Sequence, residues 1–520
     1  FRMRQNRIIT VFSYLLLIVG CALIVLAIDK AAGTGLFSQG QQMETSAPQE
    51  KEQESPPDGK PDQDVSSQTS GSEEHQTETE GKTPSGERRK WYTSQHTKKP
   101  EKDIQPPEEP KGPPRLILAT DIHYLSPKLT DYGEAFQRLT EKDDGKVLRY
   151  TPQLTDAFFE EALEYRPDAL ILSGDLTVNG EKVNHQELAQ KLAALQEQGV
   201  QVLVIPGNHD INNPNAASYI GEKKEAADPV TPQEFYEIYH SFGYDQAASR
   251  DESSLSYRYI LDETHWLLML DSCQYEPYNK VGGKIGEKTY AWIRQQYEEA
   301  EKAGAVMIPV AHHNLMGESR VYPTECAIEG GEELISILEE YEVPLYLSGH
   351  LHLQRIKKYQ PEPGAPKDAA AVTEAVTGSL SIAPCQYSLI QWAEDGTLSY
   401  SLKEVDVSSW AEASRLTDEN LLDFESYSED FVKQIVSDQI YKKLDALPED
   451  MRRPMASLYG QLNYEYCAGK AADEEDIKNT RGYWLWERNR PDSEELSLIN
   501  KMIADLKQDN TSFQTETDVD

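Results

Sequence analysis

Five short stretches in the middle of the chain combine His, Asp, Asn and Gly in a pattern typical of metal ligands. Each stretch closely follows a short apolar run, and these runs span residues 116–119, 169–172, 202–205, 306–310 and 344–347. The stretches read Asp121-Ile122-His123, Gly174-Asp175, Gly207-Asn208-His209-Asp210, His312-His313 and Gly349-His350-Leu351-His352. Ligands collect beyond the carboxyl ends of strands in open α/β sheets. The pattern therefore predicts one polynuclear metal site.

The number and type of these side chains favour two ions over one. Imidazole and carboxylate together favour transition metals such as Mn, Fe or Zn over Ca. The candidate ligands are Asp121, His123, Asp175, Asn208, His312, His350 and His352. They are too many for one tetrahedral ion, whereas two divalent ions ~3.5–4 Å apart and sharing a carboxylate use them naturally. Asp175 is the favoured bridge because it ends a central strand beside Gly174.

Spacing gives a further expectation. In extended chain, residues two apart project to the same side. On this basis Asp121 and His123 face one centre, and so do His350 and His352. The apolar pattern of residues 182–198 predicts a helix that places His185 at the surface or at the rim of the site.

The order D-x-H, G-D, G-N-H-D, H and G-H-x-H resembles that of the calcineurin-like metallophosphoesterases. The resemblance covers roughly residues 114–403, and the local sequence looks closest to the class III cyclic nucleotide phosphodiesterases. It implies that Asp121, His123 and His352 hold one ion, that Asn208, His312 and His350 hold the other, and that Asp175 bridges the two. It also implies that a water or hydroxide between the ions attacks phosphorus and displaces an alcohol.

The same resemblance implies roles for residues that are not ligands. His209 corresponds to the histidine that stabilises the transition state or protonates the leaving group, and Asp210 is expected to orient it. By the order of motif residues in this family, His312 is the metal ligand and His313 is a neighbour that faces the phosphate. The residues alone do not choose between the two, and either could be a structural histidine bonded to backbone.

Two long loops follow the first and third motifs. They span residues 124–149 and 212–251. Loops of this length beside a site are often functional, so Tyr124 and Asn212 are expected at the substrate rim. The implied substrates are small phosphodiesters. Phosphomonoesters such as nucleotides are the first alternative, and a non-catalytic envelope binding module that keeps the fold is the second.

The first thirty residues predict a bacterial membrane anchor. The run from Ile8 to Ile28 has no charged residue, and at ~1.5 Å per residue it would cross a bilayer core of about 30 Å. Arg2, Arg4 and Arg7 precede it, so the positive-inside rule places the N-terminus in the cytoplasm and the rest of the chain outside. A cleaved signal peptide, or a lipoprotein anchored through Cys21, is an alternative.

Composition defines the remaining regions. Residues 31–113 are rich in Ser, Thr, Gln, Glu and Pro and are expected to form a disordered linker. The net charge of −38 argues against nucleic acid as a bulk partner, and nothing in the sequence indicates a protein partner. Residues 114–407 are expected to form the phosphoesterase domain, an α/β fold with four layers in the order α/β/β/α.

Beyond residue 407 the hydrophobic period becomes helical. Helices are expected over residues 431–444, 453–466 and 493–507, where apolar residues recur at helical spacing. Residues 408–520 are therefore expected to form an accessory helical subdomain. The aromatic cluster 483–486 is interpreted as part of its core, and residues after Gln508 as a frayed tail.

Overall fold

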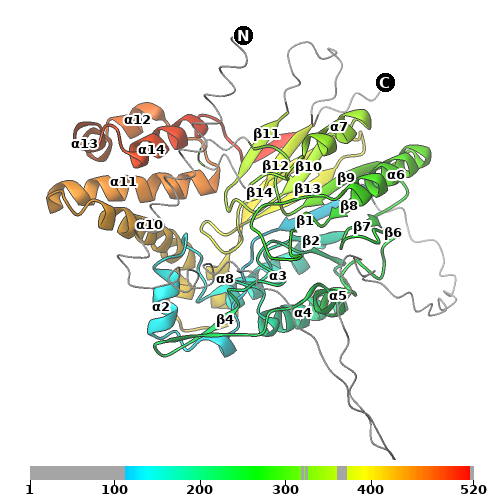
Figure 1. Ribbon diagram of the computed structural model, residues 1–520, viewed down its shortest axis with the longest axis horizontal. Helices are drawn as coiled ribbons and strands as arrows, with labels where there is room; N and C mark the ends of the chain where they lie inside the picture. The colour runs from blue at the N-terminus through cyan, green and yellow to red at the C-terminus, as the bar shows by residue number, and fades with distance from the viewer. Residues whose placement is uncertain (1–111, 318–320, 322–325, 360–371, 516–520) are drawn as a thin grey trace, which may run out of the picture. The chain divides into compact units, whose positions relative to one another are not determined.

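The computed structural model describes residues 112–317, 321, 326–359 and 372–515 (Figure 1). The expected anchor over residues 8–28 and nearly all of the expected linker lie outside these described residues. Within the described part of the chain, no helix has the length and apolar character needed to cross a bilayer.

A six-stranded sheet holds the strands that precede the first three motifs. The strand order is β15-β14-β13-β1-β2-β3. The strands are β1 (Arg115–Ala119), β2 (Ala169–Ser173), β3 (Val202–Ile205), β13 (Gln386–Trp392), β14 (Leu398–Glu404) and β15 (Ser512–Gln514). The strands β1, β2 and β3 are parallel, so their carboxyl ends meet at one edge of the sheet.

A seven-stranded sheet holds the strands that precede the last two motifs. Its order is β11-β12-β10-β9-β8-β7-β6. The strands are β6 (Ser249–Arg250), β7 (Tyr257–Ile260), β8 (His265–Leu270), β9 (Val306–Ala311), β10 (Leu345–Ser348), β11 (Arg355–Lys358) and β12 (Thr373–Val376). The neighbours β8, β9, β10 and β12 run parallel.

The two sheets pack face to face, and helices cover their outer faces (Figure 1). Residues alternate along β8: Leu267 and Met269 belong to the core shared with the six-stranded sheet, whereas Leu268 and Leu270 pack with α6 (Glu287–Ala303) and α7 (Glu332–Glu340). The six-stranded sheet is covered by α3 (Thr151–Tyr165), α4 (Lys182–Glu197), α5 (Pro232–Tyr239) and α8 (Val407–Ala413). Strand β2 is buried on both faces, which explains its continuous apolar sequence. The predicted α/β fold is confirmed.

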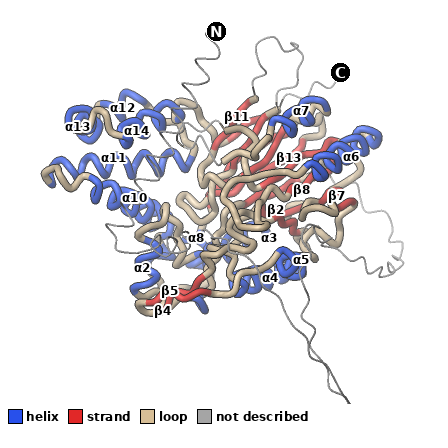
Figure 2. The backbone as a smooth tube through the Cα atoms, viewed as in Figure 1, coloured by secondary structure: helices blue, strands red, loops and turns tan. Residues whose placement is uncertain are grey.

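The two long loops contain short elements of their own (Figure 2). The first carries a 3-10 helix, η1 (Pro127–Leu129), and α2 (Glu134–Thr140). The second carries the hairpin β4 (Ala217–Ile220) and β5 (Lys223–Ala226), followed by α5. Both loops therefore contain regular secondary structure.

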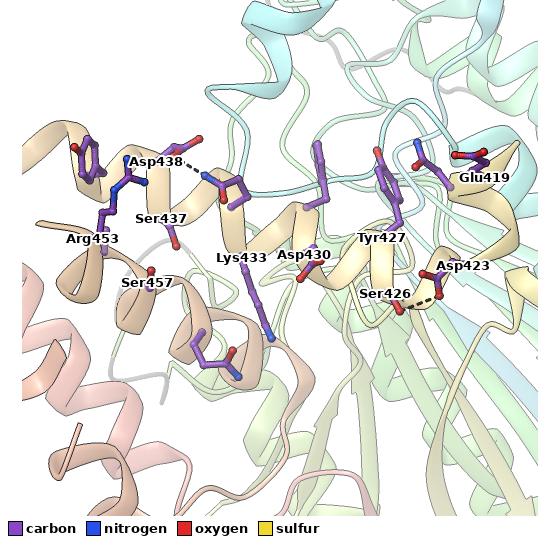
Figure 3. Close-up of a pocket in the computed structure, with 16 residues that line it drawn as sticks. Glu419, Asp423, Ser426, Tyr427, Asp430, Lys433, Ser437, Asp438, Arg453 and Ser457 are labelled. Carbon is purple, nitrogen blue, oxygen red and sulfur yellow. Dashed lines mark hydrogen bonds between the residues drawn. The ribbon is translucent and has the colours of Figure 1, made fainter. Parts of the chain in front are cut away.

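The C-terminal region is helical, as predicted. Its helices are α9 (Glu419–Leu422), α10 (Phe424–Lys443), α11 (Glu449–Ala468), α12 (Glu474–Lys478), α13 (Arg481–Asn489) and α14 (Glu494–Asp505). The helices α11, α13 and α14 share a core around the fully buried Trp486, whose Nε1–H donates to the Met455 carbonyl at 2.9 Å. Trp484 is 51% exposed, so only part of the aromatic cluster is core. A polar cleft of about 810 Å³ lies between α10 and α11 (Figure 3).

The described residues beyond Gln508, residues 509–515, correct the expectation of a frayed tail there. Ser512 to Gln514 form β15, which pairs antiparallel with β14, Ser401 opposite Ser512. The chain thus returns from the helical region to the six-stranded sheet.

Candidate metal centre

The five motif stretches converge where the two sheets meet, and backbone hydrogen bonds tie them together. The amide of Asp121 donates to the Gly174 carbonyl and that of His123 to the Asp175 carbonyl, both at 3.0 Å. The amide of Gly349 donates to the His312 carbonyl at 3.0 Å, which links the last two motifs. These backbone hydrogen bonds join the motif loops to one another.

The ligand backbone is not extended, which corrects the argument from spacing. Left-handed φ values occur at five of the predicted ligands: Asp121 (54°), His123 (45°), Asp175 (47°), His350 (73°) and His352 (55°). For residues other than glycine this conformation costs on the order of 1–2 kcal/mol each, and such strain clusters at functional sites. The alternation rule for strands therefore does not apply at these positions.

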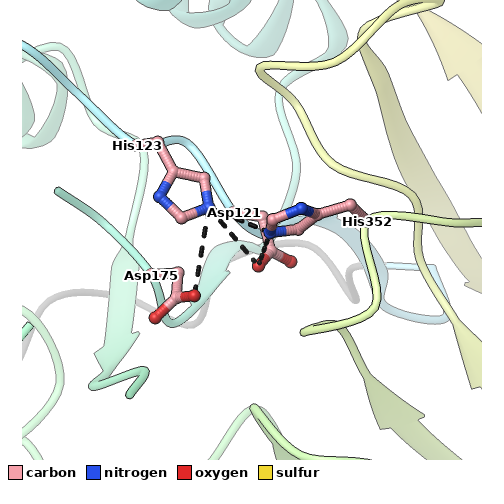
Figure 4. Close-up of side chains that lie close together, drawn as sticks. All are labelled: Asp121, His123, Asp175 and His352. Atoms are coloured by element: carbon pink, nitrogen blue, oxygen red, sulfur yellow. Dashed lines mark hydrogen bonds and ion pairs between the residues drawn. The ribbon is translucent and has the colours of Figure 1, made fainter. Parts of the chain in front are cut away.

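Asp121, His123, Asp175 and His352 form a first group (Figure 4). The Nε2 atoms of His123 and His352 lie 3.0 Å apart, and Asp121 Oδ1 lies 3.2 Å from His352 Nε2. Asp175 Oδ2 is 3.9 Å from His123 Nε2. Three of the four residues are fully or almost fully buried, and His352 is partly exposed.

Asp175, His312 and His350 form a second group, which Asn208 joins. The Nε2 atom of His312 lies 3.4 Å from Asp175 Oδ2, 3.2 Å from His350 Nδ1 and 3.1 Å from Asn208 Oδ1. Asp175 belongs to both groups. His350 and His352 fall in different groups of the same centre, the division that the resemblance implies.

The chemistry of the donors fits divalent transition-metal ions. In each group the His/Asp donor atoms lie within 4.8 Å of one another. Asp121 Oδ1 is buried and lies 3.2 Å from His352 Nε2. A buried carboxylate oxygen is costly unless a cation or proton lies beside it. Nitrogen and oxygen donors of this kind suit Mn, Fe or Zn. Ligation itself stays a prediction for all seven residues.

The distal ring nitrogens of two histidines are held by acceptors. His312 Nδ1 lies 3.0 Å from the Ser173 carbonyl at the end of β2. His352 Nδ1 lies 2.6 Å from Asp144 Oδ2, and Asp144 belongs to none of the five motifs. When Nδ1 carries the proton, the Nε2 lone pair is free to bind a metal.

Without ions, protons compensate the charge at the centre. Burial disfavours the imidazolium, but the carboxylates of Asp144 and Asp121 raise the pKa of His352 to about 10. Burial acts similarly on His312, where Asp175 raises the pKa to about 9. Burial holds the pKa of His123 well below its usual value. The buried carboxylates therefore favour the protonated forms of His352 and His312 when no metal ion is bound.

His209 lies beside both groups without joining either. Its Nδ1 lies 2.6 Å from the Val178 carbonyl, its Nε2 lies 4.0 Å from Asp175 Oδ2, and its side chain is 32% exposed. Asp210 does not contact the ring, which corrects the expected orienting role. The Asp210 carboxylate instead accepts from the amides of Gly207 at 2.8 Å, Leu176 at 3.1 Å and Thr177 at 3.0 Å. Asp210 thus joins the second motif loop to the third.

His185 is fully buried, so its expected place at the surface or rim is wrong. Its Nε2 lies 3.0 Å from the Asp210 carbonyl, and its Nδ1 lies 2.9 Å from the Tyr239 hydroxyl. Burial lowers the pKa of His185 to about 4. The neutral imidazole is therefore a structural link between α4, α5 and the third motif.

The three residues expected at the substrate rim differ in their surroundings. Tyr124 is buried and its hydroxyl is directed to Glu187, 3.4 Å away. His313 is buried, with Nδ1 2.8 Å from Ser272 Oγ and Nε2 2.8 Å from the Val281 carbonyl. Of the pair His312 and His313, His313 is thus the one that fits the alternative of a structural histidine bonded to backbone. Asn212 is partly exposed, and its amide donates to the Tyr275 carbonyl at 3.1 Å.

Two motif glycines are required by close packing. A Cβ on Gly207 would overlap the amide nitrogen and carboxylate of Asp175, and one on Gly349 would overlap the hydroxyl of Thr120. Both glycines therefore let motif loops approach each other more closely than any side chain permits.

Family models match both folded regions of the chain. Residues 114–354 match the model described as calcineurin-like phosphoesterase, and residues 406–509 match that of the C-terminal domain of cyclic nucleotide phosphodiesterase. With the two-sheet fold and the shared Asp175, these matches support the resemblance of residues 114–354 of the chain to the calcineurin-like phosphoesterases.

Several known proteins are similar to it. A glycerophosphodiester phosphodiesterase from Enterobacter lignolyticus is 28% identical over 203 residues, which cover 38% of this chain and 60% of that protein. The chain thus spans about three fifths of the length of this curated relative. A dimetal phosphatase from Danio rerio is 12% identical, with a TM-score of 0.39 and coverage of 56% of this chain and 96% of that one. A purple acid phosphatase from yellow lupin is 13% identical, with a TM-score of 0.38 and coverage of 56% and 51%.

Proposed function

We propose that the protein is a metal-dependent phosphoester hydrolase that prefers small phosphodiesters. The observation that carries the proposal is the pair of ligand groups that share Asp175, with the partly exposed His209 beside them. Two divalent ions, Mn, Fe or Zn, would supply Lewis acidity toward the phosphoryl oxygens and a water activated as nucleophile at neutral pH.

The ligand set leaves the site cationic once ions are bound. Only Asp121 and Asp175 contribute negative charge, since neutral histidines and the Asn208 amide complete the set. Two divalent ions would exceed these two carboxylates by two positive charges. The ions then dominate the local field, so a phosphate anion is attracted although the chain carries a net charge of −38.

His209 is suited to donate a proton or hydrogen bond to the substrate. The Val178 carbonyl accepts from Nδ1 and fixes the ring, while Nε2 faces the site, 4.0 Å from Asp175 Oδ2. A donor here can stabilise charge on the phosphoryl group or protonate the departing alkoxide. An alkoxide leaving group needs that proton more than a phenolate does, so His209 should matter most for alkyl diesters.

The preference for diesters rests on similarity. The curated relative from Enterobacter lignolyticus is named a glycerophosphodiester phosphodiesterase, and the model matched by residues 406–509 is named after cyclic nucleotide phosphodiesterase. Glycerophosphodiesters and cyclic nucleotides are therefore the first natural substrates to assay.

We also propose that the enzyme is tethered to the membrane and faces away from the cytoplasm. The uncharged run of residues 8–28 after three arginines supports a single-pass anchor with a cytoplasmic N-terminus. Lipid attachment through Cys21 is the alternative. Protease added to whole cells should degrade the catalytic region, and a mature N-terminus at residue 21 would identify the lipoprotein form. A catalytic region that withstands the protease in intact cells contradicts this proposal.

The activity is tested on the full chain, stripped of metal and reloaded with Mn²⁺. Bis-p-nitrophenyl phosphate and p-nitrophenyl phosphate are assayed in parallel, and faster turnover of the diester is expected. Preference for the monoester would reassign the protein as a phosphomonoesterase. No turnover with both ions bound would favour the non-catalytic binding module. Asp175→Asn is the control for contaminating hydrolases.

A further inference from the structure

We infer that the C-terminal helical region positions the predicted metal ligand His352, acting through the turn of residues 143–146. The inference rests on the proposed function, because it concerns one of the two proposed ions. Its starting point is the contact of 2.6 Å between His352 Nδ1 and Asp144 Oδ2. Asp144 comes from the long loop after the first motif and is half-exposed, with 48% of its side chain accessible.

The turn that carries Asp144 is held by its own charges. The carboxylate of Asp143 accepts from the amides of Gly145 at 3.2 Å and Lys146 at 2.9 Å. The Lys146 ammonium is only 9% exposed and pairs with both Asp143 and Asp144. A nearly buried ammonium with two carboxylate partners resists displacement, since breaking such a pair leaves an uncompensated charge. Asp144 is therefore fixed relative to the turn.

Helix α10 of the helical region holds the turn of residues 143–146 in place. The side-chain amide of Gln439 donates to the carbonyls of Asp143 at 2.8 Å and Glu141 at 3.3 Å. The fully buried Val432 packs on Gly145, where φ is +109° and a Cβ would overlap the Val432 side chain. Two independent contacts thus join this helix to the turn, one polar and one apolar.

The two proposed ions differ in what orients their histidine ligands. In the second group, His312 Nδ1 uses the Ser173 carbonyl of β2, which belongs to the buried centre of the sheet. In the first group, His352 Nδ1 bonds to the carboxylate of Asp144, whose position depends on α10. An acceptor at Nδ1 selects the tautomer that leaves the Nε2 lone pair for the metal, and loss of such a partner typically weakens binding about 10–100-fold. Through Asp144 the helical region therefore acts on the affinity of the first ion, whereas the acceptor of His312 in the second group belongs to the sheet.

The experiment measures Mn²⁺ binding to the full chain by equilibrium dialysis and elemental analysis, with melting temperature followed in parallel. Asp144→Ala removes the acceptor and should weaken one of two bound ions by about 10–100-fold. Asp144→Asn keeps an acceptor oxygen and should weaken the same ion less. Gln439→Ala should weaken that ion several-fold with the melting temperature nearly unchanged.

The matched control is Gln434→Ala on the same helix. Gln434 bonds Asp438 at 2.7 Å in the cleft of Figure 3, and five residues along a helix place it well away from the face of Gln439. This variant should bind both ions as the wild type does. Wild-type affinity for both ions in Asp144→Ala, or equal loss of both ions in Gln439→Ala, would overturn the inference while the proposed function stands. A wild-type chain that binds no ion would overturn both.

Discussion

The buried imidazole of His185 should make the stability of the protein fall steeply in mild acid. His185 has no solvent exposure, and its two ring nitrogens contact the Asp210 carbonyl and the Tyr239 hydroxyl. Burial holds its pKa at about 4, against a value of 6.5 for the exposed side chain. Since the folded pKa is depressed, the unfolded chain binds the extra proton first as pH falls.

The magnitude follows from the difference in pKa. Each unit corresponds to about 1.4 kcal/mol, so the shift from 6.5 to about 4 corresponds to about 3 kcal/mol in the free energy of unfolding. This contribution is fully present above pH 6.5 and is lost as pH falls through the window from 6.5 to 4. A glutamine at this position cannot titrate, so the variant lacks this pH dependence.

The assay is urea unfolding of metal-free wild type and His185→Gln at several pH values from 7 to 4. At pH 7 the variant should be less stable by about 1–3 kcal/mol because two buried hydrogen bonds are disturbed. Toward pH 4 the difference should shift by about 3 kcal/mol in favour of the variant, so that the variant equals or exceeds the wild type in stability. Phe235→Leu is the matched control, because its ring packs edge-on against His185 at 5.7 Å and does not titrate. A gap for His185→Gln that stays constant with pH, like that of the control, would refute the reasoning.

Three further predictions concern the site and the helical core. His209→Ala should lower kcat by about 10²–10⁴-fold with full ion content by elemental analysis, and a loss of ions would show that His209 is a ligand. Asp175→Asn should weaken both ions and abolish turnover, because Asp175 belongs to both groups; retained turnover would contradict the shared-carboxylate geometry. Trp486→Ala should destabilise the protein by about 3–5 kcal/mol in urea unfolding, whereas the exposed Trp484→Ala should change stability by less than about 0.5 kcal/mol; equal effects would disprove the assigned core.

Much of the fold could be predicted because its strands are short apolar runs that end in polar motifs. The run 169–172 became β2 (Ala169–Ser173), and the helical period of residues 431–444 became the C-terminal part of α10. These elements bury one or more faces, so apolar residues recur in their sequences at the spacing of a strand or a helix. Strand β15 has only three residues, too few to give a period, and its pairing is entirely tertiary.

The site was predictable in composition and less so in geometry. The motif residues gather in two groups, but left-handed backbone at Asp121 and His352 cannot be read from residue types that rarely adopt it. Nothing in the sequence indicated that Asp144 contacts His352, since half-exposed carboxylates in loops are common. The sequence did indicate the burial of His185: it lies three residues before Leu188 and shares the apolar stripe of α4, whose buried residues include both.

Strand β15 makes the helical region an insertion rather than an appendage. The chain leaves the six-stranded sheet at the end of β14 and returns to the neighbouring edge position at β15. Both ends of the helical region are therefore anchored to the same sheet, which limits how far it can swing. A chain shortened before Ser512 would uncover the edge of β14, and exposed strand edges promote association between molecules. Truncations meant to isolate the catalytic region should keep or replace this edge strand, and a pulling force applied just after β15 would act on this strand before it reaches any helix of the C-terminal region.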